Sequence, residues 1–374
     1  MRRHLVPNFV PFVPKECIDL AVSTLKTSWI GGDGPRVKKF ERAIAGIIGN
    51  NNVLAVNTGT SALQLALRLA GVRGSEVITT PMTCLATNAA VVMEGATPVW
   101  ADIDPETGTI DPHDIAKKIT KRTKAVMMVH WGGAPAEIDV INRIASSYNI
   151  PVIEDAAQAL GSRYNGKPIG SHSDFVAFSF QAIKIINTID GGVLATKKKS
   201  DTKRGKLLRW YGIDREERAW DEQNFFWNYP VSEIGYKMQM TDVSAAIGLG
   251  QLPFLPELLA HRRKLAKMYE SVLSKSTSLK AQRILANAKP NYWMFTIVCN
   301  NSRTKQKLWR EMNKIGITVE QAHRRNDWYP VFKKNKQDKL PGVDFFDKNH
   351  LIIPVGHWVS SRDASRIADV LSNF

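Results

Sequence analysis

The sequence contains only three cysteines, Cys17, Cys84 and Cys299, and they lie far apart. An odd number of isolated cysteines provides neither a disulfide framework nor the clustered ligands of a structural zinc site. We therefore expect reduced thiols, a cytoplasmic protein and no bound metal.

The sequence also lacks a long apolar run. Glu94 and Gly95 interrupt the stretch 89–101, which is well short of the roughly 20 apolar residues that a membrane span needs. An apolar run follows Arg2 and Arg3, but prolines interrupt it and no small-residue cleavage site follows. We expect neither a membrane span nor a secretory signal.

Acidic residues are too few to balance the basic ones. The chain has 35 Asp and Glu against 51 Lys and Arg, for a formal net charge of +16. The excess is diffuse, with nine basic against four acidic residues over 197–218 and eleven against four over 303–339. This distribution is typical of a solvated surface that attracts an anionic substrate, whereas nucleic-acid binding favours a single basic stripe. We expect no nucleic-acid partner.

Short β-rich segments alternate with helical patterns between residues 52 and 196, which is typical of successive βαβ units. Leu63, Ala66, Leu67 and Ala70 recur at helical spacing after the first of these segments, so a helix is expected there. The sequence predicts an α/β fold with a mainly parallel sheet. Strands are expected at residues 53–56, 76–79, 97–101, 125–129, 152–154, 175–180 and 192–196.

The pattern changes near residue 251, where two prolines precede an amphipathic stretch at 257–274. The remaining sequence mixes short strands with helices. We expect a large α/β domain over residues 1–250, which includes an N-terminal helix and a glycine-rich loop. A smaller α+β domain is expected over residues 251–374.

Three features of the large domain suggest chemistry. Gly59, Thr60 and Ser61 follow a strand and open a helix, where free N–H groups bind phosphate, although ordinary helix capping gives the same pattern. Asp155 ends a predicted parallel strand, where a carboxylate can pair with a protonated pyridine nitrogen or cap the next helix. Lys184 follows another strand, and a buried lysine there has a free amine for a Schiff base, whereas most lysines are solvated surface groups.

These features occur in an order that makes the sequence recognisable. It resembles the DegT/DnrJ/StrS family of nucleotide-sugar aminotransferases, which are pyridoxal-phosphate (PLP) enzymes of fold-type I. The resemblance covers nearly the whole chain. It is carried by Trp29-Ile30-Gly31-Gly32, Gly59-Thr60-Ser61-Ala62-Leu63, Glu154-Asp155-Ala156-Ala157-Gln158, Ser179-Phe180-Gln181-Ala182-Ile183-Lys184, Gly235-Tyr236, Met240-Thr241-Asp242 and His261-Arg262-Arg263.

The resemblance implies a role for each matching position. Lys184 corresponds to the lysine that carries PLP and moves a proton during the reaction, which makes it the expected catalytic residue. Asp155 corresponds to the partner of the pyridine nitrogen, and Gln158 to the neighbour of the phenolic oxygen. The residues expected to bind the cofactor are Gly59, Thr60, Ser61, Cys84, Asp155, Gln158, Ser179, Lys184 and Lys237.

Some positions depart from the usual family pattern. Cys84 follows Thr83 where the family has an aromatic residue stacked on the cofactor, and Gln181 stands where His or Tyr is usual. The Gly-Tyr-Asn-Tyr-Arg run appears with Lys237 in place of its Asn, which in the family reaches the neighbouring subunit's phosphate. A lysine also donates to phosphate and adds charge attraction. We therefore expect a homodimer with shared active sites.

Part of the family has segments similar to residues 130–133, 209–215 and 325–327, so the resemblance implies that these segments shape a pocket for the sugar nucleotide. The candidate substrate residues are Trp131, Arg209, Tyr211 and Arg325. Core packing explains the aromatic residues equally well, and a solvated face explains the arginines.

The resemblance implies an aminotransferase that moves an amino group from an amino acid, usually glutamate, to a 4-keto-6-deoxy sugar nucleotide. A PLP-dependent sugar dehydratase is a second possibility, but the dehydratases have histidine at the position of Lys184. A non-catalytic PLP-binding regulatory protein is a third, which the departures at Cys84 and Gln181 leave open.

Overall fold

The structure is a computed structural model that describes residues 5–333 and 339–374, so that Arg2 and Arg3 lie outside the described part. Its centre is a seven-stranded sheet with strand order β1-β9-β8-β5-β4-β2-β3. All seven predicted strands are present; three match the prediction, and the ends of the other four differ from it by one or two residues. They are β1 (Val53–Val56), β2 (Glu76–Thr79), β3 (Thr97–Trp100), β4 (Thr123–Val129), β5 (Val152–Asp155), β8 (Phe175–Ser179) and β9 (Gly192–Thr196).

The sheet is mainly parallel, as predicted. The pairs β2/β3, β2/β4, β4/β5 and β5/β8 are parallel, whereas β9 is antiparallel to both β8 and β1. Because β9 reverses direction between them, β1 and β8 point the same way. The carboxyl ends of β1, β2, β4, β5 and β8 therefore lie at one edge of the sheet, where open α/β sheets bind their ligands.

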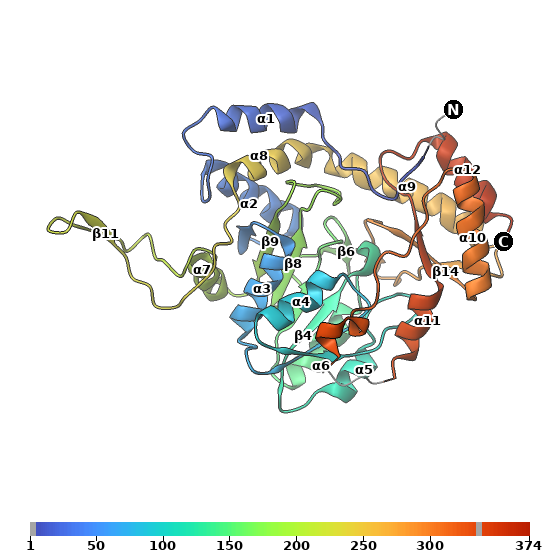
Figure 1. The fold of residues 1–374 in the computed structure, drawn as a ribbon, viewed down its shortest axis with the longest axis horizontal. Coiled ribbons are helices and arrows are strands. Elements are labelled where there is room, and N and C mark those ends of the chain that lie inside the picture. The colour runs from blue at the N-terminus through green and yellow to red at the C-terminus, as the bar shows by residue number, and fades with distance from the viewer. Residues whose placement is uncertain (1–4, 334–338) are drawn as a thin grey trace.

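Both faces of the sheet are covered by helices (Figure 1). Along β1, Val53 and Ala55 pack on one face, and Leu54 and Val56 pack on the other. The first face carries the apolar sides of α2, α5 and α6, and the second carries those of α3, α4 and α7. The bounds of these helices are α2 (Pro35–Ile48), α3 (Gly59–Ala70), α4 (Leu85–Met93), α5 (Pro112–Lys118), α6 (Ile138–Ser147) and α7 (Lys199–Leu208).

A second, antiparallel sheet follows residue 251, with strand order β12-β14-β15. It shares a separate apolar cluster with α9, α10 and α12, while the domain boundary at residue 250 stays a prediction. Val6 pairs with Ile317, so the start of the chain packs on this C-terminal part. Its elements are α9 (Leu255–Leu273), β12 (Leu279–Ala281), β14 (Phe295–Cys299), α10 (Ser302–Lys314), α11 (Pro341–Asn349), β15 (His350–Ile353) and α12 (Ser361–Leu371).

The expected N-terminal helix is α1 (Lys15–Leu25), which packs on α8 (Asp242–Gln251) (Figure 1). The helical stretch Asp242–Leu273 has the length and composition of a membrane span, yet it includes α8, which packs between α1 and α2. An apolar helix of this kind is also typical of a protein core.

A narrow arm projects from the body between α7 and α8 (Figure 1). Its tip is a two-stranded hairpin of β10 (Ala219–Asp221) and β11 (Phe226–Asn228). The remaining short elements are β6 (Arg163–Tyr164), β7 (Lys167–Pro168), β13 (Ala288–Lys289) and the 3-10 turns η1 (Trp131–Gly133), η2 (Leu252–Phe254), η3 (Asn326–Trp328) and η4 (Pro330–Phe332).

Candidate active site

Lys184 lies in the turn between β8 and β9. Gln181 shapes this turn, because its backbone carbonyl accepts from the Lys184 N–H at 2.8 Å and its side chain accepts from the Ile183 N–H at 3.1 Å. The Lys184 Nζ lies 3.7 Å from the ring centroid of Trp293. Trp293 is held in turn by a bond from its Nε1 to the Ile183 carbonyl at 3.0 Å and by stacking on Phe9. The amine is therefore held against an aromatic face.

The surroundings of Lys184 favour its neutral form. Burial lowers the pKa of the Lys184 amine to about 8, although the nearby Cys84 and Asp155 side chains act in the opposite direction. A lower pKa gives more free amine at neutral pH, and the free amine is the nucleophilic form. Lys184 is thus set apart from an ordinary solvated lysine.

Asp155 occupies the carboxyl end of β5 and is 5% exposed. Its Oδ2 accepts from the Thr87 hydroxyl at 2.7 Å, and its Oδ1 accepts from the Ala157 N–H at 3.1 Å. Thr87 also exchanges a hydrogen bond with Thr83 at 2.9 Å. These bonds orient the carboxylate at the sheet edge that Lys184 also occupies.

Gln158 connects this edge to a residue that the sequence did not single out. Its Oε1 accepts from the Gly132 N–H at 2.7 Å, and its Nε2 lies 3.4 Å from the His323 Nε2. Burial, followed by the charge of Lys184, lowers the pKa of His323 to about 4. His323 comes from the loop before η3, far along the chain. Its one sequence signal is that it lies two positions before Arg325, which the sequence suggested as a substrate residue.

The start of α3 forms a cradle with the end of β8. A Cβ added to Gly59 would lie 2.7 Å from the Ser179 Cβ, so glycine lets the helix terminus approach Ser179 this closely. Thr58 caps the helix by accepting from the Ser61 N–H at 2.9 Å. The N–H groups of Gly59 and Thr60 belong to the first helical turn, where amides lack intrahelical acceptors and bind anions.

The residues present fit PLP. A phosphate would find helix amides and the Ser179 hydroxyl in a cradle that only glycine leaves open. Asp155 is an oriented carboxylate for a pyridine nitrogen, and Lys184 supplies a primary amine of lowered pKa for an aldehyde. In the described part of the chain, no group of three or more His, Cys, Asp or Glu side chains is placed to hold a metal ion.

Cys84 lies near Lys184, whereas Tyr211 and Lys237 lie at the base of the arm. Cys84 is half-buried at the start of α4, close enough to influence Lys184. Lys237 is exposed and forms a β-bridge with Trp210 at the base of the arm. Tyr211 is 41% exposed and packs its ring edge against Trp210. The arrangement therefore divides the predicted residues between the sheet edge and the arm.

Trp131 and Arg209 are both buried. Trp131 is fully buried and donates from Nε1 to the Thr296 hydroxyl at 3.1 Å. Arg209 is 3% exposed, with its guanidinium bound to Glu41 at 2.6 Å and to the Ala55 carbonyl at 2.8 Å. The packing of Trp131 is the alternative that the sequence left open. The solvated face considered for Arg209 is wrong, because its guanidinium is buried and paired. Direct substrate contact stays a prediction for both residues.

Arg325 is buried as well and pairs with two carboxylates. Its guanidinium donates to both carboxylate oxygens of Asp327, at 2.7 and 2.6 Å, and pairs with Asp344 on α11. The next residue, Asn326, donates to the Thr83 carbonyl at 2.9 Å. This loop is thereby tied to the start of α4, next to the residues that orient Asp155.

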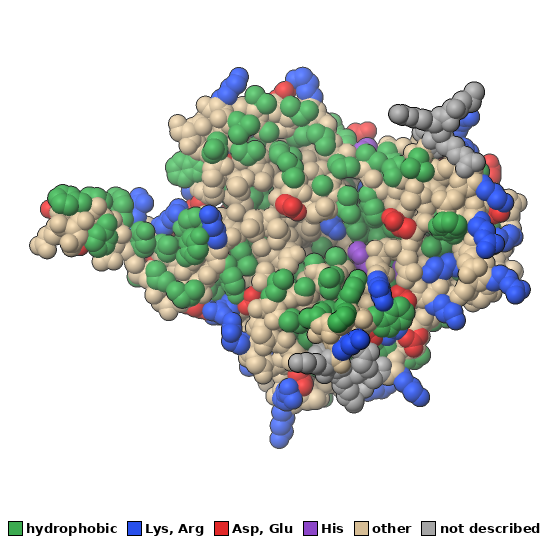
Figure 2. Space-filling view, in the orientation of Figure 1, with side chains coloured by type: hydrophobic (Ala, Val, Ile, Leu, Met, Phe, Trp, Pro, Cys, Tyr) green, Lys and Arg blue, Asp and Glu red, His purple; other side chains and the backbone are tan. Residues whose placement is uncertain are grey.

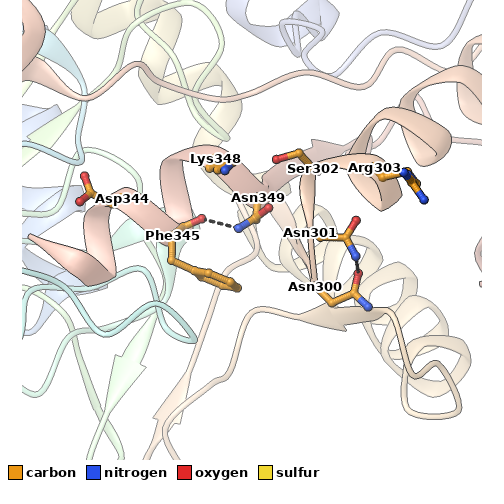
Figure 3. A pocket seen from close by; sticks show the side chains of 8 residues that line it. All are labelled: Asn300, Asn301, Ser302, Arg303, Asp344, Phe345, Lys348 and Asn349. Atoms are coloured by element: carbon orange, nitrogen blue, oxygen red, sulfur yellow. Dashed lines mark hydrogen bonds between the residues drawn. The ribbon is translucent and has the colours of Figure 1, made fainter.

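A pocket of about 670 Å³ lies elsewhere, between the start of α10 and the end of α11 (Figure 3). Asp344 on α11 lines this pocket and pairs with Arg325, so it connects the pocket to the loop before η3. The size of a pocket therefore does not identify the active site, because Lys184 and Asp155 do not line this one. Its lining residues are Asn300, Asn301, Ser302, Arg303, Asp344, Phe345, Lys348 and Asn349.

The model of the DegT/DnrJ/EryC1/StrS aminotransferase family matches residues 13–372. The chain belongs to this family. It is 32% identical to the GDP-perosamine synthase of Caulobacter vibrioides over 357 residues, which are 94% of each chain. The sugar aminotransferase CalS13 from Micromonospora echinospora superposes with a TM-score of 0.92 at 31% identity, over 99% of this chain and 100% of that one.

A further solved structure is the PLP form of the sugar aminotransferase Spr1654 from Streptococcus pneumoniae. It covers 99% of this chain and 98% of its own, with a TM-score of 0.90 and 26% identity. The fold is therefore that of the fold-type I PLP enzymes, the cofactor is PLP and the activity is that of an aminotransferase. The predicted family, fold, cofactor and enzyme class are confirmed.

Proposed function

We propose that the protein transfers an amino group from an amino acid, glutamate in the first instance, to a 4-keto-6-deoxy sugar attached to a nucleotide. The observation that carries the proposal is a half-buried Lys184 of lowered pKa near Asp155, in a chain that aligns over 94% of its length with a GDP-perosamine synthase. The diffuse positive charge favours approach of an anionic diphosphate. The product would serve a surface polysaccharide or a glycosylated metabolite.

The residues around the sheet edge would hold the cofactor in one orientation. Gly59, Thr60 and Ser179 would bind its phosphate, and Asp155, oriented by Thr87, would face the ring nitrogen. Bound PLP supplies an electron sink for the bond that breaks at the substrate carbon. Gln158, fixed by the Gly132 N–H, directs its amide toward the same space.

Lys184 has two tasks in this proposal: it carries the cofactor, and it moves the proton. With a pKa of about 8, its amine exists in both protonation states near neutral pH, which suits a group that must accept and return a proton. The ring of Trp293 lies under Nζ and stabilises the ammonium whenever the amine is free and charged. The lysine side chain therefore stays at the site when it is not bonded to the cofactor.

We also propose a homodimer in which the arm and α1 contact the second subunit. Large apolar side chains are exposed on both elements, and Figure 2 shows them over the arm and over the region of α1. Contiguous exposed apolar surface marks interaction sites. Lys237 at the arm base would then reach the partner's phosphate. The exposed arm residues are Trp220, Phe225, Phe226, Trp227, Tyr229, Val231 and Ile234.

Sedimentation of the purified protein tests the dimer. Phe225 is 79% exposed at the arm tip, so Phe225→Asp should weaken the dimer without unfolding the subunit. A matched control is Tyr148→Asp, which changes an exposed aromatic residue at the end of α6, away from the arm. A wild-type protein that sediments as a monomer would remove the proposal.

The buried thiols of Cys17 and Cys299 further support a reducing, cytoplasmic location.

Two experiments test the activity. The PLP-loaded protein should be yellow, and borohydride should leave a covalent adduct on the Lys184 peptide that is absent from Lys184→Ala. Glutamate should then bleach the colour and a keto sugar nucleotide should restore it, with ping-pong kinetics. A screen of dTDP, UDP and GDP keto sugars with mass detection identifies the acceptor. A protein whose colour no amino donor changes would instead be the non-catalytic regulator.

A further inference from the structure

His323 lies beside Lys184 but takes no part in the functions described so far. The loop before η3 brings its ring edge-on to Trp131, with ring centroids 5.6 Å apart. Its Nε2 lies 3.4 Å from the Nε2 of Gln158, and the charge of Lys184 is near enough to lower the pKa of the ring. The ring is therefore held between a buried tryptophan and an amide at the edge of the reaction space.

The contact with Gln158 determines which ring nitrogen carries the proton. Since the Gly132 N–H donates to the Gln158 Oε1 at 2.7 Å, the amide oxygen is taken and the NH₂ group must face His323. An NH₂ group only donates, so the His323 Nε2 accepts and the ring proton resides on Nδ1. Within residues 5–333 and 339–374, no acceptor meets Nδ1.

The two basic groups of the site have separate roles. Burial and the neighbouring amine lower the pKa of His323 to about 4, while that of Lys184 is about 8. Lys184 therefore takes the proton first, and His323 stays neutral throughout the range in which the amine titrates. Pairs whose pKa values are pushed apart in this way divide the chemistry, one moving the proton and the other donating a hydrogen bond.

We propose that His323 is a neutral hydrogen-bond donor whose Nδ1–H binds the carbonyl oxygen of the keto sugar at the carbon that is aminated. The identity of this oxygen rests on the proposed function. A neutral donor suits a neutral carbonyl, polarises it toward attack and adds no second positive charge beside Lys184. Gln158 is then a positioning residue for His323 as well as a neighbour of the cofactor.

Nitrogen NMR of the protein with ¹⁵N-labelled histidine tests the tautomer without any activity. The chain has eight histidines, and the His323 signals are those missing from His323→Asn. The expected result is a proton on Nδ1 and no protonation down to about pH 5. Gln158→Glu offers a carboxylate in place of the NH₂ donor, so it should move the proton to Nε2. A wild-type proton on Nε2 would overturn the proposal.

The two half-reactions test the substrate contact. His323→Leu should slow the step with the keto sugar nucleotide roughly tenfold, the effect of losing one hydrogen bond, and leave the glutamate step within about twofold. His323→Asn places an N–H near the position of Nδ1 and should stay within about threefold of wild type. Equal losses in the Asn and Leu variants, or an equal loss in both half-reactions, would overturn the inference.

These results also separate this inference from the proposed function. If the wild-type protein accepts none of the nucleotide sugars, the proposed function fails, and the NMR measurement alone decides the tautomer of His323. Cofactor colour and urea unfolding of each variant show that it is folded and loaded. A variant that slows only the sugar step while keeping both properties supports a donor at the substrate.

Discussion

Replacing Lys184 with methionine is expected to stabilise the cofactor-free protein at neutral pH while it abolishes activity. Methionine has nearly the same length as lysine and no charge, and its thioether also packs well on the Trp293 ring. The expected gain in the free energy of unfolding comes from the burial that lowers the pKa of the lysine. A group that is poised for chemistry is held in a state that folding disfavours.

The magnitude follows from the pKa of Lys184. A fall from 10.5 to about 8 corresponds to about 3 kcal/mol in favour of the unfolded state when the amine is charged. A pKa already reflects every contact of the charged amine, so the Trp293 ring adds no separate correction, and methionine keeps a similar packing contact with the ring. The expected net gain for Lys184→Met is therefore about 3 kcal/mol.

The pH dependence has a definite sign. Below about pH 8 the lysine is charged in both the folded and the unfolded protein, so its cost is fully present. As the pH rises from about 8 toward 10.5, the folded protein loses the proton first and the cost declines. The advantage of Lys184→Met should therefore shrink by about 2 kcal/mol between about pH 7 and about pH 9.5.

Urea unfolding of the cofactor-free proteins at one protein concentration measures this difference. Lys264→Met is a matched control, because Lys264 is exposed on α9 and its replacement should change stability by less than about 0.5 kcal/mol at either pH. The reasoning would be refuted by a Lys184→Met protein that is no more stable than wild type at neutral pH. A gain that does not vary with pH would refute it equally.

Two other substitutions test the cradle and the carboxylate. Gly59→Ala should weaken PLP binding roughly tenfold or more, because its Cβ would lie 2.7 Å from the Ser179 Cβ and push helix and strand apart. The control is Gly46→Ala in α2, where an added Cβ would meet nothing within 4 Å. This change should leave PLP binding unchanged and stabilise the fold by up to about 1 kcal/mol. Equal effects of the two substitutions on PLP binding would contradict this account of the cradle. Thr87→Val removes the hydroxyl that donates to Asp155 at 2.7 Å and should lower the free energy of unfolding by about 2 kcal/mol, measured with urea. Unchanged stability would mean that water replaces the threonine.

Local pattern in the sequence determined the sheet and the frame of the cofactor site. The seven strands were found within one or two residues because a strand buried on both faces is a short apolar run between turn signals. The positions of Gly59, Asp155 and Lys184 follow from that frame, since residues just after parallel strands meet at one edge. The family resemblance then supplied the cofactor and the reaction.

Only the tertiary structure decided which distant residues surround the amine. Trp293 and His323 lie more than a hundred positions beyond Lys184, and no spacing rule links a lysine to rings so far along the chain. The sequence likewise could not separate a buried arginine from a solvated one: Arg209 is engaged by Glu41 because α7 packs near α2 and β1. Local periodicity determines elements, whereas side-chain neighbours depend on how the elements pack. The order of residues along the chain thus determined where the lysine sits, and packing decided its pKa and its partners.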